Sequence, residues 1–274
     1  MITSFITLSM SILDEPSREP LPQPDFEDVA HAGRKALVSM IPVLGGAGSE
    51  LVGLLSSPVA LRRDAWLEDL ERRLRDLESK VTGFRLEDLA QNDQFVSATL
   101  VATQGALKTH QKEKLDAFKN AVLNVALGKD SNSDRQSQFL ALVDRFTAAH
   151  LTLLRFFQDP AGHFERRRIP VPTVTIGTNL LAYQLVSAAL PELRQQFQSP
   201  AEDRSASAFQ MFQVLFDDLT SAKLIALQRA KDNEAWIVPR FTAQPIPYPV
   251  NPVTTHLGDD FLAFITDPYM PSAE

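Results

Sequence analysis

The chain of 274 residues contains no cysteine, and this absence excludes disulfides, thiolate catalysis and cysteine-ligated metal sites. It also lacks the features of a secretory signal peptide. The N-terminal stretch MITSFITLSMSIL has no basic residue before its apolar part, no small-residue cleavage site, and meets Asp14 and Glu15 directly. We therefore expect a cytoplasmic protein.

The motifs of common catalytic and metal sites are missing as well. The histidines are scattered, with no HExxH, no His-x-His pair and no Gly-x-Ser-x-Gly nucleophile elbow. His150 lies among apolar residues and is expected to be a core histidine with satisfied hydrogen bonds rather than a catalytic base. His163 and Glu165 could form an acid–base pair, although a single pair at this spacing is common. We expect no catalytic residue, no cofactor and no small-molecule substrate.

Two pairs of adjacent carboxylates are candidate ligands for a divalent metal, namely Asp217 with Asp218 and Asp259 with Asp260. Neighbouring residues on a helix point about 100° apart, so neither pair can chelate one ion alone. The sequence therefore predicts no metal site.

The formal charge of the chain is −7, and the acidic excess is concentrated at the N-terminus. Residues 1–25 carry one basic and four acidic side chains; residues 26–130 carry fourteen and fifteen, and residues 131–274 carry twelve and fifteen. Both larger segments are thus close to neutral. Nucleic-acid binding by bulk positive charge is disfavoured.

Hydrophobic residues make up 44% of the chain and charged residues 22%, which is ordinary globular composition. The central element is predicted to be one long helix over residues 133–160, begun by Ser133 with Gln136 in capping-box position and ended by Pro160. Its apolar surface is too wide for a single stripe, so we expect it to be buried between the two halves of the protein. The residues at helical spacing are Phe139, Leu142, Val143, Phe146, Leu153, Leu154 and Phe157.

The sequence divides into three segments. Residues 1–24 are proline-rich and predict a disordered tail. Residues 25–130 predict an all-helical bundle of about five helices, and the polar loop 129–134 marks the boundary to a mostly helical domain over 131–274. The predicted fold is therefore mainly α, with a short β-ribbon near the C-terminus.

The bundle contains a nearly uncharged stretch, residues 36–61, in which Glu50 is the only charge. Pro42 and a glycine cluster divide it into two short apolar helices, each shorter than the roughly 20 residues of a membrane span. We interpret it as a buried helical hairpin; the alternative is a segment that inserts into a membrane. The glycines do not form a Walker A loop, because the Gly-Lys-Ser/Thr ending is missing.

The next segment, residues 61–81, predicts an amphipathic helix. Five apolar residues at steps of three and four form one narrow seam, and Glu→Arg or Asp→Arg pairs at i,i+4 lie opposite on a face expected to be solvated. The seam consists of Leu67, Leu70, Leu74, Leu77 and Val81. Gly83 is expected to end this helix, and Asp93 and Gly128 are expected to cap two later ones.

Beyond the central helix the pattern changes. Residues 170–176 are β-prone, and AWIVPRFT and VTTH predict strands. One helix is expected before Pro191 and a second, short helix after it. The final segment LGDDFLAFI predicts an amphipathic helix with Leu257, Phe261, Leu262 and Phe264 apolar. The order of helix, short strand, two helices, β-ribbon and closing helix over residues 133–266 resembles a winged-helix module.

In that resemblance, DDLTSAKLIAL corresponds to the third helix, AWIVPRFT to the start of the wing and VTTH to its returning strand. A winged helix that reads DNA needs basic or amide side chains near the start of the third helix. This helix offers Gln210, Gln213 and Lys223, but also the adjacent acids Asp217 and Asp218, which would repel phosphates. The resemblance therefore implies a protein-interaction or packing unit more than a DNA reader.

A second resemblance covers most of residues 30–160. The stretches IPVLGGAGSELVGLL, RRDAWLEDLERRL, THQKEKLDAFKNAVLNVAL and VDRFTAAHLTLLRFFQDP are similar to a family of uncharacterised bacterial helical proteins. The resemblance implies a bacterial, intracellular origin and carries no activity and no functional residue.

One concentrated positive feature remains, the run Arg166, Arg167 and Arg168. It is a candidate site for a phosphate or an acidic partner surface, and the alternative is a solvated loop. Taken together, the sequence predicts a non-enzymatic protein that binds another protein or itself. The alternatives are a winged-helix transcriptional regulator and a membrane-active effector that uses residues 36–61.

Overall fold

The computed structural model describes residues 50–129, 132–172, 180–198, 204–229, 236–238 and 252–269, and within these ranges the protein is mainly helical. Residues Val43–Glu274 form one compact unit. The predicted N-terminal tail, the helix expected after it and the first arm of the apolar hairpin lie outside the described residues.

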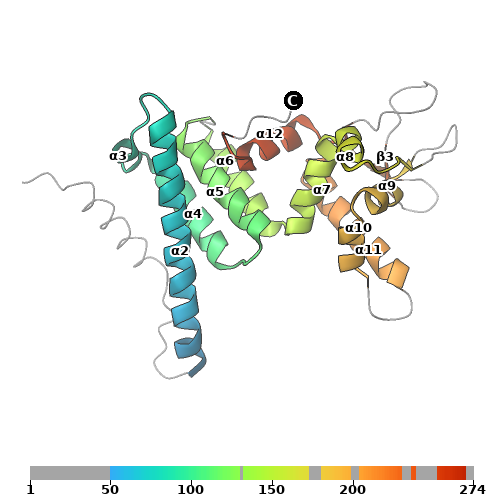
Figure 1. Cartoon of the computed structure of the whole chain (residues 1–274), viewed down its shortest axis with the longest axis horizontal. Helices are drawn as coiled ribbons and strands as arrows, with labels where there is room; N and C mark the ends of the chain where they lie inside the picture. Colours follow the sequence, from blue (N-terminus) through green and yellow to red (C-terminus); the bar gives the residue numbers. More distant parts are fainter. Residues whose placement is uncertain are drawn as a thin grey trace, which may run out of the picture. The chain divides into compact units, whose positions relative to one another are not determined.

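Four helices make up the described part of the N-terminal bundle (Figure 1). They are α2 (Glu50–Lys80), α3 (Leu86–Leu89), α4 (Asp93–Leu107) and α5 (Lys112–Ala126). The most extensive contact among these helices is between α4 and α5, and α2 packs on both. Gly83 and Gly128 follow α2 and α5 at φ +84° and +64°, the left-handed conformation that a helix-terminating glycine provides.

The predicted leucine seam of α2 is confirmed. Leu70, Leu74 and Leu77 are buried and Leu67 is partly buried, while Trp66, which the seam did not include, is also buried. The opposite face is less solvated than predicted. Lys119 of α5 is only 11% exposed in its side chain and binds Asp69 at 2.5 Å across the helices.

The expectation of a separate, buried apolar helix before residue 61 is wrong for the part that the structure describes. Residues 50–61 continue directly into the amphipathic helix as the first turns of α2, with Pro58 inside it. Val59 and Leu61 are 38% and 68% exposed. The apolar composition of this stretch predicted burial, but no described element covers these two side chains.

The predicted single helix over residues 133–160 is also wrong, because the chain breaks twice. It forms α6 (Ser133–Arg145), α7 (Ala148–Gln158) and α8 (Pro160–Arg167). Phe146 has extended backbone, φ −76° and ψ 146°, and Thr147 begins a new helix. Its backbone N–H donates to His150 Nδ1 at 3.1 Å, so the imidazole takes the part that Glu or Gln has in a usual capping box.

The burial of this region is confirmed despite the breaks. Phe139, Phe146 and Leu154 are at most 2% exposed. Helix α6 packs against α4 and α5, whereas α7 packs against α5 and two later helices, α11 (Arg204–Ser221) and α12 (His256–Ile265). The region is thus enclosed by earlier and later parts of the chain.

Helix starts were predicted one residue late at two places. Asn92, not Asp93, caps α4 by accepting a hydrogen bond from the Phe95 N–H at 3.1 Å. Asn132, not Ser133, caps α6 by accepting one from the Arg135 N–H at 2.9 Å. At both places an asparagine precedes another good capping residue, so residue type alone does not decide between them.

The remaining elements are short. They are β1 (Leu180–Leu181), α9 (Ala182–Ala189), α10 (Pro191–Gln196), β2 (Gln228–Arg229) and β3 (Trp236–Val238). The break between α9 and α10 at Pro191 is as predicted. A strand over residues 170–176 is not formed at 170–172, and its other positions lie outside the described residues.

The three strands form an antiparallel sheet in the order β1-β3-β2. Residues 236–238, predicted as the first wing strand, are the central strand and pair with both neighbours. The VTTH segment does not join the sheet; Thr254 forms an isolated bridge with Ile225. The third strand consists of Gln228, which was expected to be the last residue of a helix, and Arg229.

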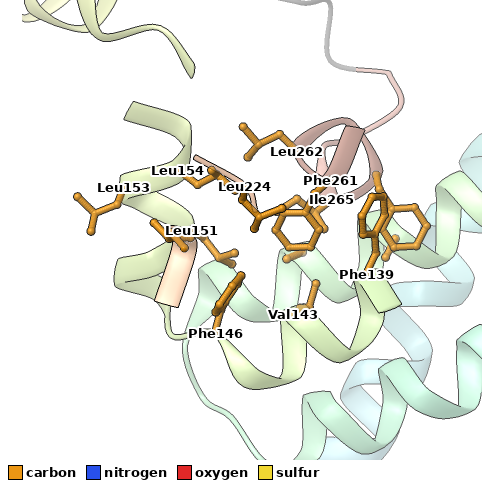
Figure 2. Packing of buried hydrophobic residues seen from close by; sticks show 14 of the residues in the cluster. Phe139, Val143, Phe146, Leu151, Leu153, Leu154, Leu224, Phe261, Leu262 and Ile265 are labelled. Atoms are coloured by element: carbon orange, nitrogen blue, oxygen red, sulfur yellow. The ribbon is translucent and has the colours of Figure 1, made fainter. Parts of the chain in front are cut away.

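Helix α12 joins the two halves. Its buried residues pack on α5 and α7, and Figure 2 shows Phe261 and Ile265 beside Phe139 and Val143 of α6. The Phe261 ring meets the Phe139 ring edge-on at 5.4 Å between centroids. Three of the four predicted apolar residues are buried, whereas Leu257 is exposed.

Candidate functional site: three surfaces and their ionisable groups

Two of the three arginines in the predicted site are bound to acids of the same chain. Arg166 Nη1 lies 2.8 Å from Asp159 Oδ2, and Arg167 Nη1 lies 2.6 Å from Glu192 Oε1. These hydrogen bonds lower the pKa of Asp159 and of Glu192, so both carboxylates stay ionised. The positive charge of these two arginines is therefore largely balanced.

Arg168 differs from its neighbours. It ends α8 in the left-handed conformation, with φ 54°, and its N–H donates to the Glu165 carbonyl at 3.0 Å. Its side chain is exposed and makes no ion pair with the described residues. The run offers one unbalanced cation rather than three, and its role in binding an anion or a partner stays a prediction.

His150 is a buried structural residue, as predicted. Its ring is stacked on Phe146 at 4.9 Å, its Nδ1 accepts from Thr147, and its Nε2 lies 3.2 Å from Asp218 Oδ2. An accepting Nδ1 leaves the proton of the neutral ring on Nε2, from which it donates to Asp218. Burial lowers the pKa of His150, and Asp218 only partly opposes this effect.

The predicted His163–Glu165 pair is not formed. The Nε2 atom of His163 lies 3.0 Å from the Ala189 carbonyl oxygen, which ties α8 to α9, and the ring packs edge-on against Phe156. A donor held by a backbone carbonyl is a structural contact. Glu165 itself is exposed.

The two pairs of adjacent acids point to separate partners. Asp217 binds Arg229 and Asp218 binds His150, while Asp259 accepts from Thr254 Oγ1 at 2.7 Å and Asp260 lies 3.4 Å from Arg135. Within the part of the chain that the structure describes, no three His, Asp or Glu residues gather as metal ligands would.

A hollow of about 330 Å³ lies between the starts of α4 and α6. Hydroxyl, amide and carboxylate groups line it together with apolar residues, and they include Asp93, Ser97, Ser133 and Gln136. No histidine, lysine or arginine lines the hollow, so its serines have no base beside them. The hollow is suited to hydrogen bonding rather than to nucleophilic chemistry.

The outward face of α11 forms the first candidate interaction surface, which we call the α11 stripe. Buried residues of α11 recur at helical spacing from Ala208 to Leu219. The outward-facing residues on the opposite side of the helix recur at the same spacing. The α11 stripe consists of Gln210, Val214, Asp217 and Ser221. Val214 is 51% exposed, which makes it the second most exposed large apolar side chain in the described part of the protein.

Positive charge is scarce near the α11 stripe. Residues 206–221 include no lysine or arginine. Arg229 of β2 binds Asp217, and its guanidinium lies over the Trp236 ring at 4.7 Å from the centroid. This cation is thereby engaged by an acid and an aromatic ring, whereas Lys223, two residues past the end of α11, is exposed. The sequence signal for this surface is the helical spacing of its four residues.

The start of α2 forms the second candidate surface. Val59 and Leu61 are exposed there, followed by Arg62, which is also exposed, and Arg63, which binds Asp64 at 3.0 Å. No helix among the residues that the structure describes is long and apolar enough to span a bilayer. The predicted membrane-active segment lies only partly within the described residues, from position 50 onward.

The chain was also compared with known proteins. No protein-family model matches it, and neither curated proteins nor solved structures yield a match. The resemblances to uncharacterised bacterial helical proteins and to winged-helix modules therefore stay predictions.

Proposed function

We propose that this protein is a non-enzymatic interaction protein, which binds another protein or a second copy of itself through the α11 stripe. The observation that carries the proposal is the composition of this face: an exposed valine, an amide, a hydroxyl and a carboxylate balanced by Arg229, with no lysine or arginine among residues 206–221. A mixed apolar and polar face of this kind suits a protein surface. It does not suit a phosphate backbone, which attracts basic residues.

The surroundings of the ionisable groups support the same proposal. The two candidate histidines are engaged in contacts that hold helices together: His150 joins α7 to α11, and His163 joins α8 to α9. A general base must instead reach a substrate proton within hydrogen-bond distance. The surfaces of the protein, rather than these buried groups, are therefore the features left to account for its function.

The second candidate is a winged-helix transcriptional regulator, and one observation favours it. A short strand precedes α9, two helices and an antiparallel ribbon follow, and β3 pairs with both other strands. This order is similar to that of the winged-helix resemblance, but three helices rather than two lie between β1 and the ribbon. The adjacent acids Asp217 and Asp218 on this helix argue against contact with a phosphate backbone, so the regulator is the second candidate.

Site-specific crosslinking tests the proposal. A photo-reactive amino acid would replace Val214 in the full chain, and a matched chain would carry it at Val101 of α4, which is 43% exposed. We expect protein adducts at position 214 in excess of those at 101. Adducts to the same chain would identify self-association, and adducts to another polypeptide would identify an adaptor.

Two outcomes would contradict the proposal. Equal adduct yields at positions 214 and 101 would show that the α11 stripe has no specific partner. Crosslinks to DNA at position 214, together with retarded genomic fragments in a gel-shift assay, would instead establish the regulator.

A further inference from the structure

The corner between α6 and α7 is built on the neutral form of one histidine. His150 Nδ1 accepts a hydrogen bond from the Thr147 N–H at 3.1 Å, and the Thr147 side chain accepts one from the His150 backbone in return. This reciprocal pair holds the first turn of α7. In a usual capping box a glutamine oxygen can take the place of Nδ1, and an amide oxygen accepts at any pH. An imidazole nitrogen accepts a hydrogen bond only while it is unprotonated.

Protonation of the ring therefore removes the acceptor on which the cap depends. A protonated imidazole carries a donor at both nitrogens, so no rotation of the ring restores an acceptor for the Thr147 N–H. The ring has little freedom to turn away, because His150 is 5% exposed and is stacked on the buried Phe146 ring at 4.9 Å between centroids. The first turn of α7 must then give up its cap.

The charged groups around the ring come from three other helices. Burial lowers the pKa of the ring most; Asp218 of α11, 3.2 Å from Nε2, raises it, and Arg145 of α6 and Lys114 of α5 lower it. The acids of α12 face the far end of α7, where Asp259 lies 3.4 Å from Gln158. The contact with Asp218 is available in both protonation states, because Nε2 donates in both.

We infer that the α6–α7 corner is an acid-sensitive switch, in which protonation of His150 releases the Thr147 N–H and opens the first turn of α7 while the contact with Asp218 is kept. The corner connects α6, which packs on α4 and α5, to α7, which packs on α5, α11 and α12. Phe146 lies in the corner and meets Phe261 of α12 at 6.3 Å between ring centroids. Acid thus loosens the connection between the bundle and the second half of the protein.

Amide hydrogen exchange of the full chain, followed by NMR, tests the inference. Protection factors, which correct for the intrinsic effect of pH on exchange, would be compared at about pH 7.5 and about pH 5. We expect the amides of Thr147, His150 and Leu151 to lose protection about tenfold or more at the lower pH, while the amides of α4 and α5 keep theirs. The Thr147 amide resonance and the ring nitrogens of His150 should titrate with the same midpoint.

Two variants separate the switch from other effects of acid. His150→Gln places an amide oxygen at the capping position, so protection of the first turn of α7 should be the same at both pH values. The matched control is His163→Gln. His163 lies in α8 and its Nε2 contacts the Ala189 carbonyl, to which a protonated ring also donates. This variant should keep the pH response that the wild type shows at residues 147–151.

The inference is overturned if protection of the first turn of α7 is equal at both pH values, or if it falls as much in His150→Gln as in the wild type. A loss of the same size throughout α4 and α5 would show global unfolding and would also overturn it. Should His150→Gln fail to fold, the wild-type titration decides. A ring that titrates without any shift of the Thr147 amide resonance excludes the switch.

Discussion

The two halves of this protein are packed in different ways. The α4–α5 contact in the bundle is built mainly from small side chains, whereas the core around α6, α7, α11 and α12 is built from phenylalanine rings. The small buried residues are Ala98, Ala102, Ala106, Ala117 and Ala121. The buried rings are Phe139, Phe146, Phe156, Phe157, Phe212, Phe216, Phe261 and Phe264.

This difference determines how each half responds to substitution. Small residues let two helices approach closely, so that interface has no room for added atoms. Phenylalanine rings bury a large apolar area and make preferred edge-on contacts. The aromatic core therefore depends on large side chains, and a substitution by alanine removes many of their atoms. The first half should therefore be sensitive to enlargement and the second to truncation.

The largest effect is expected from Phe216→Ala in the aromatic half. The Phe216 ring is fully buried, 5.9 Å from the Phe157 ring and 6.0 Å from the Phe212 ring, so truncation leaves a cavity. The free energy of unfolding should fall by about 3–5 kcal/mol in urea denaturation. Val214→Ala, two residues away and exposed, is the control and should change it by less than about 0.5 kcal/mol. Similar losses in both variants would contradict the assigned core.

The second effect concerns the junction of the two halves. Asn124 of α5 donates through Nδ2 to the carbonyl oxygens of Phe264 and Thr266, both at 2.9 Å, and Asn120 donates to that of Ile265 at 3.0 Å. Asn124→Ala leaves buried carbonyl groups at the end of α12 without hydrogen-bond donors. The free energy of unfolding should therefore fall by about 1–3 kcal/mol. Hydrogen exchange should rise first in α12. Equal protection of α12 in mutant and wild type would show that this contact does not hold the helix.

The third prediction tests the close packing of the bundle directly. A Cβ atom on Gly105 would lie 2.2 Å from Cζ of the buried Phe118 ring, so Gly105→Ala forces the ring to move. Overpacking costs about 1–3 kcal/mol, and the better helix propensity of alanine returns about 1 kcal/mol. We expect a net loss of about 1 kcal/mol by urea denaturation. In the Phe118→Leu background the same substitution should become neutral or stabilising; an unchanged loss there would locate the strain elsewhere.

The smallest effect is expected from His150, an ionisable ring that is buried in the aromatic half. Burial lowers the pKa of His150 below its unfolded value of about 6.5, so the unfolded chain binds a proton more readily. Stability should therefore fall as pH drops below about 6.5, by less than about 1.4 kcal/mol per pH unit from this group. His150→Gln should have a lower overall stability and a flatter pH dependence between pH 7 and 5.5. An identical slope in both proteins would exclude His150 as the cause.

Much of the helical architecture followed from local patterns. The leucine seam of α2, the glycines after α2 and α5, and the break at Pro191 each depend on residues within one or two turns, which sequence reasoning can evaluate. The break at Thr147 was missed because the apolar spacing continues through it and because His150 is an unusual capping partner. The exposure of Leu61 was missed because composition predicts a tendency to be buried without identifying what covers the residue.

Contacts between distant residues could not be predicted. Asn124 and Phe264 are 140 positions apart, and nothing in the sequence around either one indicates the other. The same holds for the contact of Asp69 with Lys119 of α5, because the pattern within α2 assigned Asp69 to a solvated face. The predicted arginine site was affected most by this limit of sequence reasoning. Whether the charges of Arg166 and Arg167 are balanced depends on where Asp159 and Glu192 lie after folding.

The asparagine contacts with α12 have a consequence for biosynthesis. The helix that covers one side of α5 follows it by about 140 positions, so a ribosome must add all of these residues before α5 can be shielded from water. Until then the nascent bundle presents an uncovered apolar face, and any product that stops before α12 retains it. Such products should need chaperones or be degraded, so folding of the bundle depends on synthesis having reached α12.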